Sequence, residues 1–583
     1  MTDGGGCDDR EDERGEIEGA IIKIRSLSIS VVPAIIGLVF VLCGGLYHIL
    51  LSNYFLNDDF GRIIWLTPLQ DMGTLDALIS LFANSYHPVY YRPFTNLVFY
   101  LLRQVVGLNA EYYYLSSIIL HFVSCVAFFY LVRELADRQR VKGRFFPIVA
   151  TLLFTVNPRH VEAVSYIHDN ENVICGLFFF LGLFLFIRYC KSQREAYLAF
   201  SAISYMFSLF GKEMGVTLPL VCFAYYAFVF ATDFSIKEIY RDRVVRKSIG
   251  AFTSVMILYM VLRYNGLGML IGGGGFTGDL DFSLLRMLRT GLQSMIAMGL
   301  PNDVPGLHAA AVFFRGHIVL FCGLGLLSGG FVVYKARDYR DRVFWFGAIW
   351  AVLTLVPVLN NGIGVAELTG GRYLYVPLAG FAICLASLLS QFKTINKTLV
   401  CAGLIILVYS SFTYRNNLLM YSVSQISEGF LRGLEEVLDI EGQERVVIVL
   451  PSMYKGMYML QSSLDSALNI LYGERGVELN KRIAFILYMY VENHADFDVR
   501  VEHIGDMTRV DMVSGAQFFR KKVYYGQSLL DRFGLSFQDN TQVNTNGDYI
   551  SKRAEFSSVD VIVIPELKDP ASGNRIYRMR DEM

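Results

Sequence analysis

The chain has 583 residues, of which 54% are hydrophobic, 14% aromatic and only 18% charged. Ordinary soluble domains carry about 25% charged residues, so this composition and a mean hydropathy of +0.40 argue against a soluble globular protein. The formal net charge of −1 hides an uneven distribution, because residues 1–18 and 430–583 are acidic whereas the apolar part between them is basic. Its nine cysteines show no Cys-x-x-Cys or zinc-like spacing, which favours neither a disulfide scaffold nor a structural metal site.

Long apolar runs, each close to the roughly 20 residues that a helix needs to cross a bilayer, recur along the chain. We count eleven, which predicts a polytopic membrane protein. The first run follows residues 1–27, an expected acidic cytoplasmic tail, and no small-residue cleavage site follows the run, so it is expected to be a retained anchor. The runs lie near residues 28–51, 112–132, 146–160, 173–189, 197–211, 215–232, 249–265, 314–334, 343–359, 373–391 and 398–414.

Lys and Arg gather in alternate short loops, which orients the chain because basic loops stay on the cytoplasmic side. This orientation places the N-terminus inside and, since the number of runs is odd, residues 430–583 outside. Two extracytoplasmic loops, 52–111 and 266–313, are too long to be simple turns. The first contains the amphipathic run RPFTNLVFYLLRQVVG, which is suited to lie along the membrane interface.

Residues 430–583 have the pattern of a small extracytoplasmic α+β domain that is long enough to bury its own core. ERVVIVLP and KRIAFILYMYV are strand-like, SMYKGMYMLQSSLDSALNILYG has helical periodicity, and VDVIVIPE is expected to be a closing strand. The expected fold is therefore mainly α. It consists of a polytopic membrane helix bundle of about 11 transmembrane helices over residues 28–415, followed by this C-terminal domain.

Ionisable residues cluster in five places at the outer ends of the apolar runs. A charge near lipid is costly and is usually retained for a site or a pathway. Carboxylates beside Lys and Arg suit a general base next to a site for an anionic leaving group. The five stretches are FLNDDFGRIIW with Asp58 and Asp59, SYHPVYYRPFTN with His87 and Arg92, NPRHVEAVSYIHDNEN with Arg159, His160, Glu162, His168, Asp169 and Glu171, FGKEMGVTLP with Lys212 and Glu213, and ELTGGRYLYVP with Glu367, Arg372 and Tyr373.

Each stretch also has a purely structural interpretation. Only the occurrence of all five on one side of the membrane favours the functional one. The structural alternatives are a loop cap for Asp58 and Asp59, a helix-end ion pair for Lys212 and Glu213, a hydrogen-bonded histidine for His160, headgroup anchors for Arg372 and Tyr373, and ordinary exposed loop residues for His168, Asp169 and Glu171.

In this order, the five stretches resemble the membrane region of the transmembrane O-mannosyltransferases that act on cadherins, and of prokaryotic protein O-mannosyltransferase-like relatives. More broadly they resemble the GT-C superfamily of membrane glycosyltransferases. The resemblance departs from the family at Asn157, where a histidine is usual, and at Gly371, where an acidic residue is common. It covers about residues 28–415 and rests on the acidic pair after the first run, YRPFTNLVF with GLNAEYYYLSSIILHFV, NPRHVEAVSYI with CGLFFFLGLFLFIRY, GKEMGVTLPL and GRYLYVPLAGF.

The resemblance implies transfer of a mannose-like sugar from a polyprenyl-phosphate carrier to a hydroxyl of a protein, lipid or glycan acceptor. Transfer would occur on the outer face of the membrane, with inversion at the anomeric carbon. Asp58 or Asp59 would be the general base. The substrate-binding residues would be Arg92, Lys212 and Arg372 as candidates for the departing phosphate, His160 and Glu162 in the pocket, and Glu213 and Tyr373 beside them.

The expected partners are the lipid-linked donor, the acceptor and membrane lipids, without nucleic acid. An Asp pair is also able to bind Mg²⁺ or Mn²⁺, so the cofactor is left open between none and a divalent cation at Asp58 and Asp59. The expected location is the cell (inner) membrane in a prokaryote or the endoplasmic reticulum in a eukaryote. Two other classes remain: a transporter or lipid flippase, whose charges are expected within the spans rather than at their ends, and a non-catalytic scaffold with the same fold.

Overall fold

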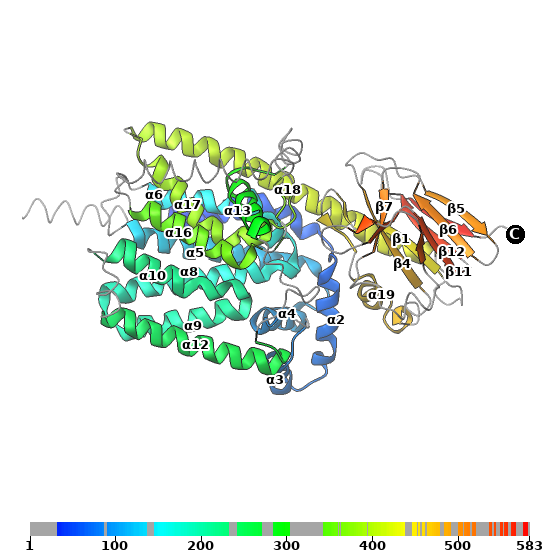
Figure 1. Ribbon diagram of the computed structural model, residues 1–583, viewed down its shortest axis with the longest axis horizontal. Helices are drawn as coiled ribbons and strands as arrows, with labels where there is room; N and C mark the ends of the chain where they lie inside the picture. Colours follow the sequence, from blue (N-terminus) through cyan, green and yellow to red (C-terminus); the bar gives the residue numbers. More distant parts are fainter. Residues whose placement is uncertain are drawn as a thin grey trace, which may run out of the picture.

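The computed structural model shows a bundle of helices and a smaller part built mainly of strands (Figure 1). It describes residues 32–86, 90–136, 145–231, 242–270, 284–302, 342–359, 361, 363–365, 367–392, 394–437, 446–451, 453–454, 457–460, 463–477, 483–490, 499–504, 507–512, 516–520, 536–538, 542–543, 549–551, 553–557, 561–566 and 575–580.

The bundle begins with a helix over 32–47, and several of its later helices are joined or extended by short helical turns. The α-helices are α2 Asp58–Gln70, α3 Thr74–Ala83, α4 Pro93–Val106, α5 Ala110–Ala136, α6 Phe146–Thr155, α7 Val161–Ser165, α8 Asn170–Ser192, α9 Glu195–Gly211, α10 Leu218–Tyr225, α12 Arg243–Leu267, α13 Leu284–Gly299, α16 Arg342–Leu355, α17 Tyr375–Leu389 and α18 Ile395–Val437. The turns are η1 His48–Ser52, η2 Pro158–His160, η3 Ile167–Asp169, η4 Glu213–Thr217, η5 Tyr226–Phe230, η6 Val356–Val358 and η7 Gly371–Leu374.

Every predicted apolar run within the described residues is largely helical, and the run near 314–334 lies outside them. Among the described helices, seven are long and apolar enough to cross a membrane. This confirms a mainly α, polytopic bundle. The seven span Val32–Ser52, Ala110–Ala136, Ile167–Ser192, Glu213–Phe230, Arg243–Leu267, Gly371–Leu389 and Ile395–Leu434.

Several predicted boundaries differ from the structure, and two of the differences concern how a helix ends. The run near 146–160 is α-helical only to Thr155, because Asn157 precedes a proline and takes the extended conformation that such residues prefer. The run near 398–414 belongs to a much longer helix, α18, which continues without a break to Val437.

The centre of the bundle is the helix that contains α8. In the most apolar 18-residue stretch of Ile167–Ser192, 72% is buried, whereas in the corresponding stretch of Ile395–Leu434 only 17% is buried. α8 packs against α5 and α9, while α16 packs against α17. α18 therefore lies on the periphery of the bundle, whereas the first turn of α8 is surrounded by protein.

The strand region consists of the described residues between 446 and 580, whose strands form three sheets. Its strands are β1 Val446–Pro451, β2 Met453–Tyr454, β3 Met457–Tyr458, β4 Ile483–Tyr490, β5 Val499–Ile504, β6 Met507–Met512, β7 Ala516–Arg520, β8 Ser536–Gln538, β9 Gln542–Val543, β10 Tyr549–Ser551, β11 Arg553–Ser557, β12 Val561–Glu566 and β13 Arg575–Arg580. The largest sheet has the order β13-β12-β1-β4-β7-β10-β9, in which β1 is parallel to β12 and β4 and the other pairs are antiparallel. A second has the order β5-β6-β11-β8, and β2 and β3 form a hairpin.

The predicted strands ERVVIVLP, KRIAFILYMYV and VDVIVIPE correspond to β1, β4 and β12. Two details of the prediction are wrong. The first part of SMYKGMYMLQSSLDSALNILYG forms the hairpin of β2 and β3, and only its second part is helical, as α19 Leu464–Tyr472. β12 is not the closing strand, because β13 follows it and pairs with it in antiparallel register.

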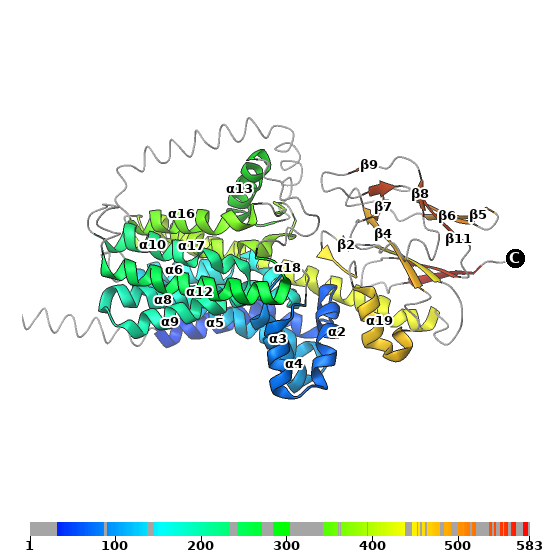
Figure 2. The same ribbon diagram turned by 60° about the horizontal axis from the view of Figure 1, so that its bottom comes forward.

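α18 leads from the bundle to the strand region, which lies beyond the end of the bundle where α2 is found (Figure 1 and Figure 2). α19 packs against α2. The backbone N–H of Asn57, just before α2, donates to the carbonyl of Met459 at 3.0 Å. The strand region and the start of α2 are therefore directly connected.

Close packing of α16 on α17 depends on two facing glycines, Gly347 and Gly380. A methyl group added at Gly380 would lie 2.5 Å from the Gly347 carbonyl oxygen and 2.7 Å from the Ala351 nitrogen. We expect Gly380→Ala to cost about 1–3 kcal/mol, because backbone atoms must separate. Gly403→Ala is the control, since nothing lies within 4 Å of its added methyl group. Thermal unfolding in detergent measures both, and equal Tm values for the two variants would contradict this close contact.

Candidate functional site

The candidate site begins at the turn before α2. Asn57 has φ 35° and ψ −113°, a rare conformation for a residue other than glycine that costs about 1–3 kcal/mol. The backbone is held there from outside, since Asn57 N–H donates to Met459 and Asp58 N–H donates to the Tyr166 hydroxyl at 3.0 Å. These bonds fix the backbone at Asp58, whose side chain is half-buried.

Asp59, by contrast, is fully buried and its carboxylate is engaged by backbone donors. Its Oδ2 accepts from Leu56 N–H at 2.9 Å and its Oδ1 accepts from His168 N–H at 2.7 Å. Burial raises the pKa of Asp59 to about 8, the two N–H donors oppose this rise, and Asp58 and Asp169 add to it. Asp59 thus joins the start of α2 to η3.

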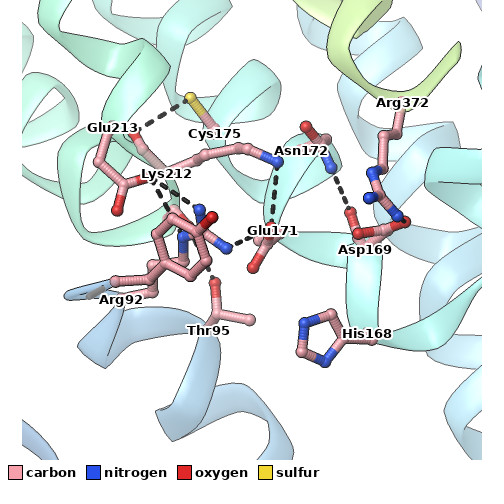
Figure 3. A network of polar contacts seen from close by, with 12 residues as sticks. Arg92, Thr95, His168, Asp169, Glu171, Asn172, Cys175, Lys212, Glu213 and Arg372 are labelled. Carbon is pink, nitrogen blue, oxygen red and sulfur yellow. Dashed lines mark hydrogen bonds and ion pairs between the residues drawn. The ribbon is translucent and has the colours of Figure 1, made fainter. Parts of the chain in front are cut away.

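Glu171, in the first turn of α8, is bound by three cations from other parts of the chain. Its Oε1 accepts from Arg92 Nη1 at 2.5 Å and from Lys212 Nζ at 3.0 Å (Figure 3). Its Oε2 accepts from Arg62 Nη2 at 3.4 Å. The residue is only 2% exposed, so these partners replace water around its charge. The helix N-terminus also favours a negative charge at this position.

Arg92, just before α4, joins Glu171 to a second carboxylate. Its Nη2 and Nε donate to Glu213 Oε2 at 2.8 and 3.2 Å, and Arg263 Nη1 lies 3.6 Å from Glu213 Oε1. Burial lowers the pKa of Arg92, but Glu171 and Glu213 outweigh this effect and raise it above its usual value. Arg92 therefore stays charged although it is buried.

Arg372, in η7, makes a second group of ion pairs. Its Nη1 donates to Asp169 Oδ2 at 2.8 Å and lies 3.5 Å from Glu162 Oε1, while its backbone N–H donates to Glu162 Oε2 at 2.9 Å. The Tyr373 ring lies between the two groups, with Arg372 Cζ 5.1 Å and Lys212 Nζ 5.0 Å from its centroid. The Arg372 side chain is 19% exposed, which makes it more accessible than Arg92 or Lys212.

These side chains form one charged cluster at the α2 end of the bundle. It contains five basic and four acidic groups before Asp58 is counted. The charged cluster consists of the basic residues Arg62, Arg92, Lys212, Arg263 and Arg372 and the acidic residues Glu162, Asp169, Glu171 and Glu213.

Arg159 and His160 have different surroundings from the charged cluster. Arg159 is buried, and its guanidinium donates to the backbone carbonyls of Ala297, Leu300, Gly364, Val365 and Glu367, which ties α13 and the segment before η7 to η2. The His160 ring packs in the aromatic core of the bundle. Its centroid lies 4.5 Å from that of Phe154 and 4.6 Å from that of Tyr375.

The structure brings most of the predicted site residues to one place. Arg92, Glu162, Lys212, Glu213 and Arg372 all belong to the charged cluster, and Tyr373 lies between its two groups. Asp58 and Asp59 begin α2, the helix that also carries Arg62 of the charged cluster, and Asp59 accepts from the backbone N–H of His168, the residue before Asp169. The predicted substrate contact His160 lies in the aromatic core instead, and His87 lies outside the described residues. The roles of these residues remain predictions.

The interpretation of Asp169 and Glu171 as ordinary exposed loop residues is wrong, because both are 2% exposed and ion-paired. Sequence reasoning also missed Arg62 and Arg263. Arg263 had an available signal, since it interrupts the apolar run near 249–265 and a charge within such a run needs a partner. Arg62 follows the acidic pair by one helical turn and had no comparable signal.

A divalent cation shared by Asp58 and Asp59 fits this geometry poorly. Mg²⁺ and Mn²⁺ need several oxygen ligands. Both oxygens of Asp59 already accept backbone N–H bonds, and the residue is buried. Among the described residues, no group of three or more His, Cys, Asp or Glu side chains gathers around this pair. We therefore derive no chemical step through a metal at this position.

Replacing Glu171 by glutamine tests its central place in the charged cluster. Glu171→Gln removes the charge that three buried cations share, so we expect a loss of about 3–5 kcal/mol in unfolding free energy. Glu195→Gln is the matched control, because Glu195 is 57% exposed in its pair with Lys247 and should cost only about 0–1 kcal/mol. Thermal or denaturant unfolding of the purified proteins measures both, and a loss in Glu171→Gln no larger than in the control would refute the central role.

The buried carboxyl of Asp59 predicts a pH dependence of stability. Folding raises its pKa from 3.8 to about 8, so between these values unfolding releases its proton. Stability should therefore fall as pH rises, by at most about 1.4 kcal/mol per pH unit, and level off above about pH 8. Asp59→Asn removes this titration. We expect the Tm of the variant to depend less steeply on pH between about 5 and 8 than that of the wild type, whatever the offset between them. Parallel curves would show that Asp59 does not titrate in this range.

No family model matches the sequence, but curated proteins contain similar segments. Protein O-mannosyl-transferase TMTC2 of Homo sapiens is 30% identical over 173 residues, which are 29% of this chain and 20% of that protein. Protein O-mannosyl-transferase TMTC3 of Homo sapiens is 24% identical over 376 residues, 56% of this chain and 39% of that protein. Protein O-mannosyl-transferase F38B6.6 of Caenorhabditis elegans is 23% identical over 447 residues, 71% of this chain and 58% of that protein.

Two solved structures align with most of the chain. ArnT from Cupriavidus metallidurans bound to undecaprenyl phosphate gives a TM-score of 0.39 at 11% identity and covers 79% of this chain and 93% of that one. The archaeal oligosaccharyltransferase AglB from Archaeoglobus fulgidus, in complex with an inhibitory peptide and a dolichol-phosphate, gives 0.38 at 12% identity, with coverages of 79% and 69%. TM-scores of this size do not by themselves establish a shared fold.

The sequence relatives are therefore the informative comparison. The chain spans between a fifth and three fifths of their length, so the match concerns part of each protein. All three bear the name predicted from the order of the motifs. Over the matched segments, the chain is a homologue of the protein O-mannosyl-transferases.

Proposed function

We propose that the protein is a membrane glycosyltransferase. It moves a mannose-like sugar from a polyprenyl-phosphate carrier to a hydroxyl of a protein, lipid or glycan acceptor. The observation that supports this most directly is the position of Asp58, a half-buried carboxylate beside a buried cluster with an excess of basic groups. Such a pair of features suits a base next to an anionic leaving group. The homologous segments of the O-mannosyl-transferases support the same reaction class.

Asp58 is the proposed general base. Asp59 is less suited to this role, because both of its oxygens accept backbone N–H bonds and its raised pKa keeps it protonated near neutral pH. Asp58 has its backbone fixed by Tyr166 and by the turn at Asn57, which limits the positions that its carboxylate can take. In this proposal Asp59 is a positioning residue for Asp58.

The cations of the charged cluster are the proposed binding site for the phosphate of the donor. Arg372 is the strongest candidate for direct contact, since it is the most exposed of the predicted phosphate ligands. Arg92 and Lys212 share Glu171 and are nearly buried, so they act through the positive potential of the cluster. A planar guanidinium also matches the geometry of a phosphate better than an ammonium does.

The reaction is a single displacement at the anomeric carbon. The acceptor hydroxyl loses its proton to the Asp58 carboxylate, and its oxygen forms the new bond to the anomeric carbon. The bond between that carbon and the phosphate oxygen breaks, and the polyprenyl phosphate leaves with the electron pair. The charged cluster stabilises the negative charge that develops on the departing oxygen. A one-step displacement inverts the anomeric configuration.

The acceptor is proposed to approach from the side of the strand region. This region contacts the turn before α2 through Met459, and α19 packs against α2. The proposed site and the strand region therefore belong to one face of the membrane. On the topology expected from the basic loops, that face is extracytoplasmic.

The proposal is tested by replacing the base. We expect Asp58→Asn to lower kcat for sugar transfer by about 10²–10⁴-fold, the usual contribution of a general base, with little change in the KM for the donor. Asp71→Asn, at the exposed C-terminal end of the same helix, should keep wild-type activity. The measurement is incorporation of labelled mannose from polyprenyl-phosphate mannose by membranes that contain each full-length protein. Equal rates in both variants would remove Asp58 as the base, and no transfer by the wild type would overturn the proposed donor.

A further inference from the structure

We propose that the interior of the bundle contains a zinc site formed by Cys43, His121 and Cys125. The inference is independent of the proposed transferase site, because these residues lie outside the charged cluster. Cys43 is on the helix over 32–47, and His121 and Cys125 are on α5. The sequence does not predict the site, since its ligands come from two separate apolar runs.

The three side chains have the spacing of metal ligands. One ligand atom from each lies within 4.8 Å of the others, and all three residues are buried. The Cys125 Sγ lies 3.7 Å from His121 Nε2 and 3.9 Å from Nδ1. With Zn–S bonds of about 2.3 Å and Zn–N bonds of about 2.0–2.1 Å, a tetrahedral ion needs these atoms roughly 3.6 Å apart. Because this sulfur lies nearly equally far from both ring nitrogens, the imidazole has to turn until one nitrogen lone pair points at the ion.

A polar side chain without a partner lies beside this group. Tyr47 is one helical turn after Cys43, is 0% exposed, and its ring centroid lies 5.5 Å from that of His121. Its hydroxyl has no hydrogen-bond partner among the described residues. An unsatisfied hydroxyl inside an apolar bundle costs free energy. A metal ion bound by Cys43 and Cys125 would give the Tyr47 hydroxyl a polar neighbour and so lower this cost.

The histidine has the outer contacts that metal-binding histidines usually have. Its Nδ1 lies 2.8 Å from the Tyr375 hydroxyl and its Nε2 lies 3.3 Å from the Thr155 carbonyl oxygen. The nitrogen that binds the ion gives up its present partner, and the partner of the other nitrogen is placed to orient the ring. Because Tyr375 begins α17 and Thr155 ends α6, the site connects four helices of the bundle.

The charge of the site favours a divalent ion over a monovalent one. Two thiolates and a neutral imidazole carry two negative charges, which Zn²⁺ balances completely when the two thiol protons leave to solvent. Cu⁺ would leave one negative charge in the apolar interior, where an unpaired charge is costly. Thiolate and imidazole are also the ligands that zinc prefers. The residues therefore favour Zn²⁺ over Cu⁺.

Metal analysis of the purified full-length protein tests the proposal. After purification without chelator and with equimolar Zn²⁺ followed by dialysis, we expect about one zinc ion per chain. Cys43→Ser and Cys125→Ser should each lower this content at least tenfold. Cys222→Ser is the matched control, because Cys222 is another buried cysteine of the bundle that is outside the group. It should keep the wild-type content.

A second measurement keeps the test valid if a serine variant fails to fold. Wild-type protein loaded with Co²⁺ in place of Zn²⁺ should show the ultraviolet sulfur-to-cobalt charge-transfer absorption of thiolate ligands, and a chelator that removes the metal should lower its Tm. Absence of bound zinc and of this absorption would overturn the proposal. So would copper as the retained ion, a disulfide between Cys43 and Cys125 by mass spectrometry of alkylated protein, or loss of zinc only in Cys222→Ser.

Discussion

The arrangement of the candidate site depends on one buried carboxylate, that of Glu171. A charge that is 2% exposed has to be neutralised by protein groups, because the bilayer and the packed helices offer it no water. Its three partners come from α2, from the residue before α4 and from the turn after α9. These segments are far apart in the sequence, and α4 also packs against α2 and α9. Their common counter-ion adds an electrostatic reason for their meeting at the N-terminus of α8.

The polar groups of the bundle lie in two regions with different surroundings. At the α2 end the bundle keeps charges and balances them by ion pairs. In the interior, around His121, polar side chains lie among aromatic rings and cysteines. Tyr375 lies close to both, since it contacts His121 and follows Arg372 by three residues. A change in the interior can consequently reach the site through η7 and the first turn of α17.

Much of the helical part was predictable because apolar runs of bilayer length are a strong local signal. The strands β1, β4 and β12 were also predictable from a local signal, because each is a short run of mostly apolar residues that favour strands. The hairpin of β2 and β3 was not, because Met and Tyr fit a helix equally well and only the sheet context decides. In the site, motif order pointed to Arg92, Lys212 and Arg372. For Glu171 the sequence left a site residue and an exposed loop residue as alternatives, and its burial in the first turn of α8 decides against the loop.

α18 has a mechanical consequence for the whole molecule. At 43 residues and about 1.5 Å per residue it is roughly 65 Å long, about twice the thickness of the hydrocarbon core. Two hydrogen bonds join it to the end of the first helix and to the segment before α2. The Asn417 side chain donates to the Leu46 carbonyl, and the Ser424 hydroxyl accepts from the Tyr54 backbone N–H. The continuous helix thus acts as a rigid spacer between the bundle and the strand region. When the bundle tilts or the bilayer changes thickness, the strand region and the start of α2 move together, and the distance between them is preserved.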